Sequence, residues 1–278
     1  MFGPSYPCAS LFFAIFGLFS QIAPRQYDRP GVSNWTAACG QQSSVASPDR
    51  LHSAYVSCSD GEEVRTLRLT VMDSAGKAIS RVSAQVKPAC TPAALEWLDD
   101  RRVGFVCQTD PQVRNYVVFD IQTGSATQYP GYWFVWSPDH QTLADVKLDV
   151  MFGTPAGENS CLFLNATAVY PADCNHARES YSHIHTFILP LVWSADGSKV
   201  AFVEKIFDWE YFDPFLRYFD GEASNAHYYL VIASTGHVEG YAIDSEAAQQ
   251  VPAWQSNSRL QLGDMTYDLD SSPPSSIP

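Results

Sequence analysis

The sequence predicts an all-β chain built from repeated four-stranded units, and three observations carry this prediction. A motif recurs in which a strand ends at a tryptophan, a polar turn follows and a second apolar strand begins; the tryptophans are Trp97, Trp136, Trp193 and Trp254. Counting a weaker copy at Ala46, the copies are 51, 39, 57 and 61 residues apart. That spacing fits units of roughly 40–45 residues with insertions. Outside residues 9–23, no stretch keeps a helical periodicity of apolar residues.

The turn after each tryptophan predicts the first hairpin of a unit. Trp136-Ser-Pro-Asp139 is followed by HQTLADVKL, and Trp193-Ser-Ala-Asp196 is followed by GSKVAFVEK. We expect Asp139 and Asp196 to cap these turns, because a short carboxylate can accept hydrogen bonds from backbone amides close in sequence. A second hairpin follows, with Thr-Gly between two apolar runs in residues 115–129 and 228–241. Each unit therefore reads as four antiparallel strands, A to D.

The pattern W-S-x-D-G-x-x-[VL]-A-F, followed by a strand ending D-x-x-T-G, resembles the WD40-like (PD40) repeat of TolB-like β-propellers. Residues 193–203 match closely, residues 136–146 nearly so, and residues 117–124 supply the second half. The resemblance covers residues 43 to about 264 and implies a secreted β-propeller of bacterial type. Ala46 and Asn257 depart from the pattern. The chain holds about four and a half units, whereas the family usually has about six or seven blades.

We therefore expect a propeller of five blades, with four blades as the alternative. A propeller protects its sheet edges, so residues 26–40 are expected to complete the last blade, which begins at Trp254. Residues 24–270 would form the propeller domain, and the Ser/Pro-rich residues 271–278 a disordered tail.

Residues 1–23 form an apolar N-terminal segment. Its uncharged run, residues 9–23, is shorter than the roughly 20 residues that a membrane helix needs, and it suits a signal peptide. An uncleaved anchor is the alternative. We expect a secreted or periplasmic protein whose mature chain has no membrane span.

Apart from Cys8, the chain has six cysteines, and none has the spacing of a zinc ligand set. In a propeller blade, the D–A and B–C connections lie on one face, called here the top face. The unit boundaries place all six cysteines on that face. We expect three disulfides: Cys39–Cys58, Cys90–Cys107 and Cys161–Cys174. Six buried free thiols in a cytosolic protein are the alternative.

Three long insertions also fall on the top face, at residues 153–160, 172–186 and 206–226. Long connections in compact domains are often functional. The last insertion is rich in aromatic residues, and the candidate binding residues are Trp209, Tyr211, Phe212, Phe215 and Tyr218, with His183 and His185 beside them. The alternative is that these rings pack the insertion onto the propeller.

The net charge and the absence of known catalytic motifs narrow the range of possible functions. The chain has 17 Lys and Arg against 30 Asp and Glu, which argues against a nucleic-acid partner. The sequence contains no G-x-S-x-G, H-E-x-x-H or P-loop motif. His183 and His185 would lie on the same side of a strand, as surface histidines rather than metal ligands. We expect a monomeric, non-catalytic scaffold that binds a protein or a glycan and needs no metal or cofactor. The alternative is a propeller enzyme, a glycan hydrolase or lyase with a carboxylate site in the top face or central channel.

Overall fold

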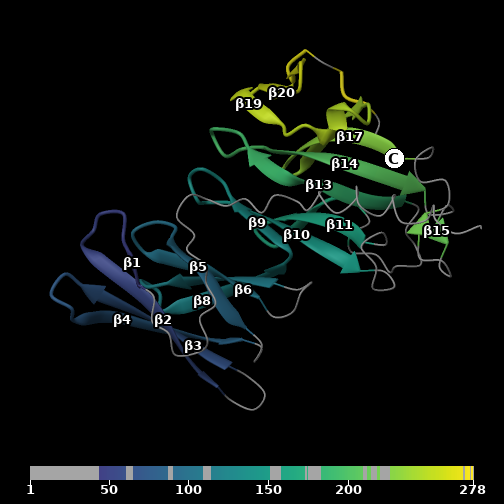
Figure 1. The fold of residues 1–278 in the computed structure, drawn as a ribbon. Coiled ribbons are helices and arrows are strands. Elements are labelled where there is room, and N and C mark those ends of the chain that lie inside the picture. The colour runs from purple at the N-terminus through teal and green to yellow at the C-terminus, as the bar shows by residue number, and fades with distance from the viewer. Residues whose placement is uncertain are drawn as a thin grey trace, which may run out of the picture. The chain divides into compact units, whose positions relative to one another are not determined.

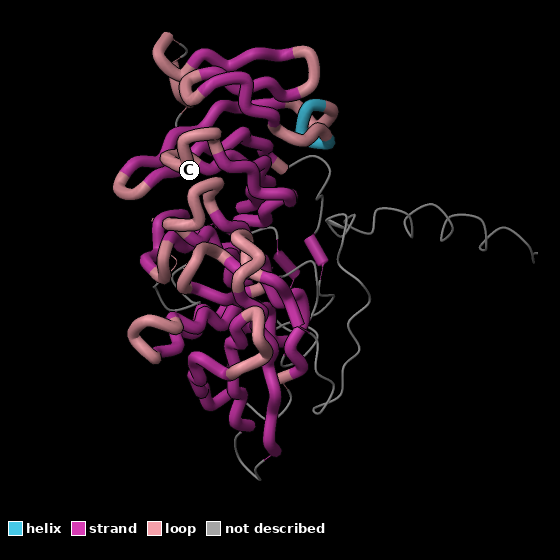
Figure 2. The backbone as a smooth tube through the Cα atoms, turned by 90° about the vertical axis from the view of Figure 1, so that its left-hand side faces the viewer, coloured by secondary structure: helices cyan, strands magenta, loops and turns pink. Residues whose placement is uncertain are grey.

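The computed structural model describes residues 44–60, 65–86, 90–108, 114–150, 158–172, 174, 183–208, 212–213, 218–219, 226–271, 273–275 and 277. These residues form four four-stranded antiparallel sheets, one three-stranded sheet and a two-stranded hairpin, β15–β16. The helical element among them is one short 3-10 turn, η4 (Ala247–Gln249), drawn in cyan in Figure 2. No helix in the described ranges has the length and apolar character that crossing a membrane would require. The prediction of an all-β chain is confirmed.

Five sheets follow one another along the chain as blades (Figure 1). Blade one is β1 (Ser44–Ala46), β2 (His52–Asp60), β3 (Arg65–Asp73) and β4 (Ala78–Val86). Blade two is β5 (Thr91–Trp97), β6 (Arg102–Gln108), β7 (Arg114–Asp120) and β8 (Ser125–Gly131). Blade three is β9 (Trp133–Trp136), β10 (Leu143–Val150), β11 (Glu158–Leu164) and β12 (Thr167–Tyr170).

Blade four is β13 (His183–Trp193), β14 (Val200–Asp208), β17 (His227–Ser234) and β18 (His237–Ile243). Blade five is β19 (Ala253–Ser256), β20 (Arg259–Leu262) and β21 (Met265–Asp268). In every blade, strands that are consecutive within the blade pair with each other. The five repeated sheets confirm the β-propeller prediction. Residues 26–40, expected to complete blade five, lie outside the described residues.

The repeat tryptophans lie where the sequence predicts them. Strands β5, β9 and β13 end at Trp97, Trp136 and Trp193, all three buried, and the partly buried Trp254 lies within β19. Three indoles donate to a carbonyl oxygen of the preceding blade: Trp97 to Val45 (3.1 Å), Trp193 to Val135 (3.0 Å) and Trp254 to Val192 (2.9 Å). The first strands of blades two, four and five are thereby tied to the first strand of the blade before each of them.

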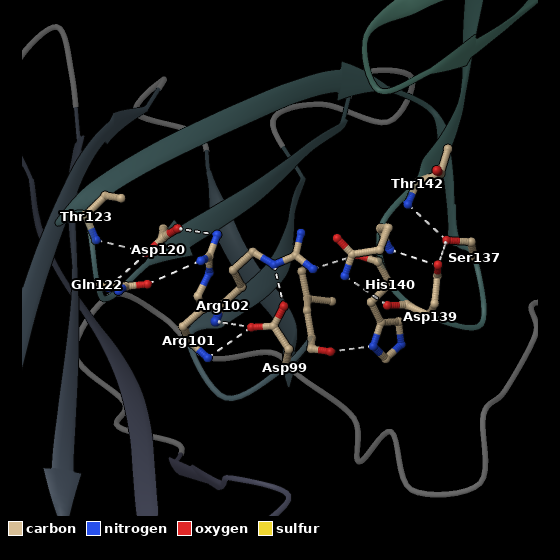
Figure 3. Close-up of polar contacts among 12 residues, drawn as sticks. Asp99, Arg101, Arg102, Asp120, Gln122, Thr123, Ser137, Asp139, His140 and Thr142 are labelled. Carbon is tan, nitrogen blue, oxygen red and sulfur yellow. Dashed lines mark hydrogen bonds and ion pairs between the residues drawn. The ribbon is translucent and has the colours of Figure 1, made fainter. Parts of the chain in front are cut away.

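The turn after each tryptophan is held by a serine and an aspartate. The Ser137 hydroxyl donates to Oδ1 of Asp139 (2.6 Å) and accepts from the amide of Thr142 (2.9 Å), as Figure 3 shows. Ser194 and Asp196 repeat the arrangement, with a 2.7 Å hydrogen bond between the two side chains. These serine hydrogen bonds lower the pKa of both aspartates. The predicted capping roles of Asp139 and Asp196 are confirmed.

Neighbouring turns also hold each other at the junction of blades two and three (Figure 3). The guanidinium of Arg102 donates through Nε to Asp99 (2.6 Å) and through Nη2 to the carbonyl oxygen of His140 (2.7 Å). It also lies over the indole of Trp136, 5.7 Å from the ring centroid. The imidazole of His140 in turn contacts the carbonyl oxygen of Leu98. The two turns are therefore joined in both directions.

Apolar side chains fill the space between successive blades. One buried cluster joins blades one and two, and includes Leu69, Phe105 and Phe119. Further clusters join blades two and three, three and four, and four and five. Large residues on the alternating positions of strands B and C supply most of this core, which is the pattern expected of sheets packed face to face.

The described residues of the C-terminal tail contact β18, and the expectation of a disordered tail over residues 271–278 stays a prediction. Ser275 forms a bridge with β18, its amide donating to the carbonyl oxygen of Gly240 (2.6 Å). Its hydroxyl accepts a hydrogen bond from the amide of Ala242 (3.1 Å). A Cβ at position 240 would lie 2.3 Å from Cδ1 of Ile277, so a larger residue there would displace the Ile277 side chain. These backbone bonds and the packing of Ile277 hold the described tail residues against β18.

Candidate functional site

Two predicted disulfides mark the top face. Cys90 precedes β5 and Cys107 lies near the end of β6, with Cα atoms 5.1 Å apart. Cys161 lies in β11 and pairs with Cys174, which follows β12, at a Cα separation of 5.7 Å. Both pairings are confirmed. The third prediction falls on Cys39, which lies outside the described residues; Cys58 is disulfide-bonded.

A pocket of about 280 Å³ opens at the top end of the outer strands of blade four. It is lined by residues 226–229, at the start of β17, and residues 242–245, at the end of β18. The lining residues include His227, Tyr228, Tyr229 and Asp244. The ammonium group of Lys205 lies 5.9 Å from the centroid of the Tyr228 ring. The pocket is therefore lined by aromatic residues and one acidic residue, and Lys205 lies near one of the aromatic rings.

The local fold fixes Asp244 at the pocket rim. Its Oδ1 accepts hydrogen bonds from the amides of Glu246 (3.0 Å) and Ala247 (2.7 Å), at the start of the η4 turn. Asp244 also contributes a charge that, together with burial, raises the pKa of Tyr267 in blade five; burial is the larger cause. A carboxylate held by two amides keeps its position when a ligand enters.

A buried polar cluster lies between blades three and four. The Tyr170 hydroxyl at the end of β12 donates to Glu204 (2.6 Å), and Nδ1 of His185 lies 2.7 Å from the other oxygen of that carboxyl. Glu204 is 0% exposed and His185 is 2% exposed. Burial raises the pKa of Glu204, while the contacts with His185 and Tyr170 act in the opposite direction.

The buried cluster continues to the wall of the pocket. Tyr229 is the cross-strand partner of Glu204 in the β14–β17 pair, and it also lines the pocket. Burial, followed by the Glu204 charge, raises the pKa of Tyr229.

The structure changes the expected setting of the two predicted histidines. His183 and His185 lie in strand β13 rather than in a loop, with ring centroids 6.5 Å apart, so the prediction that they share a side is confirmed. His183 is partly exposed, but the expectation of a surface histidine is wrong for His185. The reason is that this side of β13 faces the hydroxyl of Tyr170 and the carboxyl of Glu204. Across the described ranges, no three His, Cys, Asp or Glu residues group as a metal site would require.

The predicted aromatic residues of the 206–226 insertion divide into two groups. Phe212 lies in β15 (Phe212–Asp213) and Tyr218 lies in β16 (Tyr218–Phe219), and these two strands pair with each other. Trp209, Tyr211 and Phe215 lie outside the described residues. The binding role of all five stays a prediction.

Sequence reasoning missed Tyr170, Glu204 and the pocket residues Tyr228, Tyr229 and Asp244. A signal was present for one of them. Glu204 is a charged residue within the apolar run VAFVEKIF, on the same strand face as the buried Val200 and Phe202. A carboxyl at such a position needs hydrogen-bond donors from its surroundings, which is how it is held here.

No family model matches the chain, and no curated protein matches it. Among solved structures, the β-propeller domain of the Trilobed protease from Pyrococcus furiosus is 13% identical at a TM-score of 0.33, covering 73% of this chain and 68% of the other. A prolyl endopeptidase is 12% identical at a TM-score of 0.38, covering 78% and 31%, so the chain spans less than a third of that enzyme. Synechocystis apocarotenoid oxygenase is 11% identical at a TM-score of 0.30, covering 82% and 59%.

The five meandering sheets and their repeated tryptophan turns define the chain as a β-propeller protein. Its distinguishing features are the disulfides on the top face and the pocket on blade four.

Proposed function

We propose that this protein is an extracytoplasmic, non-catalytic β-propeller with TolB-like repeats, and that it binds a partner protein through the top face of blade four. One observation carries the proposal. The pocket between β17 and β18 opens at the same end of blade four from which the aromatic insertion, residues 206–226, leaves β14 and returns to β17. Aromatic rings beside a polar rim are typical of protein-binding surfaces.

The position of the charged groups supports binding rather than turnover. The His185–Glu204 pair is the kind of arrangement that orients a general base, but both side chains are almost completely buried. Tyr229, the cross-strand partner of Glu204, is among the residues that line the pocket, and Glu204 and His185 are not. The pair therefore supports the pocket wall.

The disulfides support an extracytoplasmic location. Cys90–Cys107 and Cys161–Cys174 each close a short loop within one blade. Such bonds form and persist in oxidising compartments and are rare in the cytosol. The location matters to the function because the partner must then be found in the periplasm or outside the cell.

Partner capture from envelope extract by wild-type and variant protein tests the proposal. Tyr228→Ala removes a pocket ring whose loss leaves the buried cluster intact, and we expect it to reduce capture of the same partner by about tenfold, or roughly 1.4 kcal/mol. Leu51→Ala, which truncates an exposed side chain in the turn between β1 and β2, is the matched control and should leave capture unchanged. Equal capture by both variants, with equal melting temperatures, would place the binding site elsewhere.

A further inference from the structure

Asp145 is a buried carboxyl without a partner. It lies in β10, is 1% exposed, and neither of its oxygens has a hydrogen-bond partner among the described residues. Its cross-strand neighbours are Phe134 in β9 and Phe163 in β11. Native proteins pair almost all of their buried polar atoms, so two unpaired oxygens in one carboxyl require an explanation.

The charged groups near Asp145 are committed to other contacts. Lys147, two residues along β10, places its ammonium group 3.5 Å from the centroid of the Phe163 ring. From blade two, β8 contributes the phenol of Tyr129, on which Asp145 acts electrostatically. Two further polar side chains near this face are Arg102, bonded to Asp99 and the carbonyl oxygen of His140, and Tyr116, bonded to Glu96. None of them pairs with the Asp145 carboxyl.

The carboxyl lies beside the β8–β9 connection, the link by which the chain passes from blade two to blade three. The amide of Tyr132, which follows the last strand of blade two, donates to the carbonyl oxygen of Val146, the next residue after Asp145 (2.6 Å). Above this link, the guanidinium of Arg114 lies 5.2 Å from the ring centroid of Tyr132 and 5.6 Å from that of Trp133. A movement of β10 at Asp145 would therefore be transmitted through Tyr132 to Arg114 on the top face.

We infer that Asp145 is a proton-controlled lock on the contact between blades two and three. With the proton bound, the carboxyl is neutral and the aromatic and apolar groups around it pack closely. Without the proton, a bare carboxylate lies between Phe134 and Phe163 and must draw in water or a cation, which loosens the contact. The inference does not depend on the proposed binding function.

The direction of titration agrees with this geometry. Burial raises the pKa of Asp145 from 3.8 to about 7, and the positive charge of Lys147 opposes the rise. A native pKa above the unfolded value means that the folded state holds the proton more tightly. The contribution of Asp145 to stability is therefore complete below about pH 4, falls as the pH rises towards 7, and stays low above that value.

The melting temperature between pH 5 and pH 9 tests the inference on the full chain. Asp145→Asn and Asp145→Leu cannot ionise, so their melting temperatures should fall less with rising pH than that of the wild type. We expect the difference between pH 5 and pH 8.5 to be smaller by about 3–8 °C. Asp264→Asn removes an exposed carboxylate and is the matched control; it should keep the wild-type slope. The same slope in all four proteins would overturn the inference.

A measurement on the wild type alone decides the question if the variants do not fold. The carboxyl carbon of Asp145, followed by NMR, should titrate with a midpoint near 7. Protection of the Tyr132 amide from hydrogen exchange, corrected for the intrinsic rate, should fall by about tenfold or more as the carboxyl ionises. A midpoint near 4, or constant protection of Tyr132, would contradict the lock.

Discussion

The indole Nε1 of Trp193 donates a 3.0 Å hydrogen bond to the carbonyl oxygen of Val135 in the preceding blade. The acceptor is the residue just before Trp136, the tryptophan of that blade. Trp136 itself differs, because its buried Nε1 has no hydrogen-bond partner among the described residues. Two tryptophans at equivalent positions thus contribute differently to the contact between blades.

Replacing each of these tryptophans with phenylalanine should separate the hydrogen bond from ring packing. Trp193→Phe leaves the Val135 carbonyl without its donor and should lower the free energy of unfolding by about 1–3 kcal/mol more than Trp136→Phe does. Trp193→Ala also opens a cavity and should cost about 3–5 kcal/mol. Urea denaturation measures all three. Equal losses for the two Phe variants would mean that the indole hydrogen bond adds nothing.

The disulfides make a prediction about connectivity and stability. Peptide mapping without reduction should show Cys90–Cys107 and Cys161–Cys174, together with the predicted Cys39–Cys58. Replacing both Cys161 and Cys174 with serine should lower the free energy of unfolding by about 3 kcal/mol, because the unfolded chain loses a constraint. Any bridge between cysteines of different blades would contradict the topology.

The hydrogen bond from the Tyr170 hydroxyl to Glu204 predicts how the stability of the protein depends on pH. Tyr170→Phe removes a donor to a fully buried carboxyl and should cost about 1–3 kcal/mol. Because the Tyr170 hydrogen bond lowers the pKa of Glu204, its loss should raise that pKa further. Burial already holds this pKa above its unfolded value of 4.5, so the stability that the neutral carboxyl contributes is lost as the pH rises. In the variant, this loss should extend to a higher pH.

Urea denaturation at pH 5, 7 and 8.5 would measure the Tyr170 effect. Tyr267→Phe is the matched control, because that hydroxyl donates to the sulfur of Met265 at 3.8 Å rather than to a carboxyl. A loss in Tyr170→Phe no larger than the control loss would show that Glu204 does not need this donor.

Mutations in the aromatic insertion, residues 206–226, can distinguish a role in partner recognition from a role in packing. Replacing Trp209 and Tyr211 with alanine should reduce partner capture by about tenfold or more, on the order of 1.4 kcal/mol, with little change in melting temperature. Large aromatic side chains give much contact area at low entropy cost, so their loss should fall on binding. A variant that melts several degrees lower and still captures the same partner would identify the insertion as a structural brace.

The repeated part of the fold could be predicted because its signals are local. The hydrogen bonds of Ser137 with Asp139, and of Ser194 with Asp196, join residues two positions apart, so the turn is visible in the sequence. The alternation of strand residues then places Trp136 and Trp193 at strand ends. The cysteine pairings followed from the same unit boundaries.

The candidate site could not be predicted, because its partners come from different blades. Tyr170 and Glu204 are 34 residues apart, and His185 and Glu204 are 19 apart. Alternation put His183 and His185 on one side of a strand, but it did not show that this side faces blade three. Only the packing of the blades brings Tyr170 of blade three to the carboxyl of Glu204.

The three indole hydrogen bonds between neighbouring blades affect how the stability of the chain responds to mutation and to the gain or loss of a repeat. Contacts that reach only the nearest neighbour make the stability of a repeat protein close to a sum of repeat and interface contributions, as in a linear array. Damage to the Trp193–Val135 link would then weaken one junction and leave that of Trp97 with Val45 intact. In such an array, gaining a blade adds one junction and losing a blade removes one, so chains of this kind can change length in steps of one repeat.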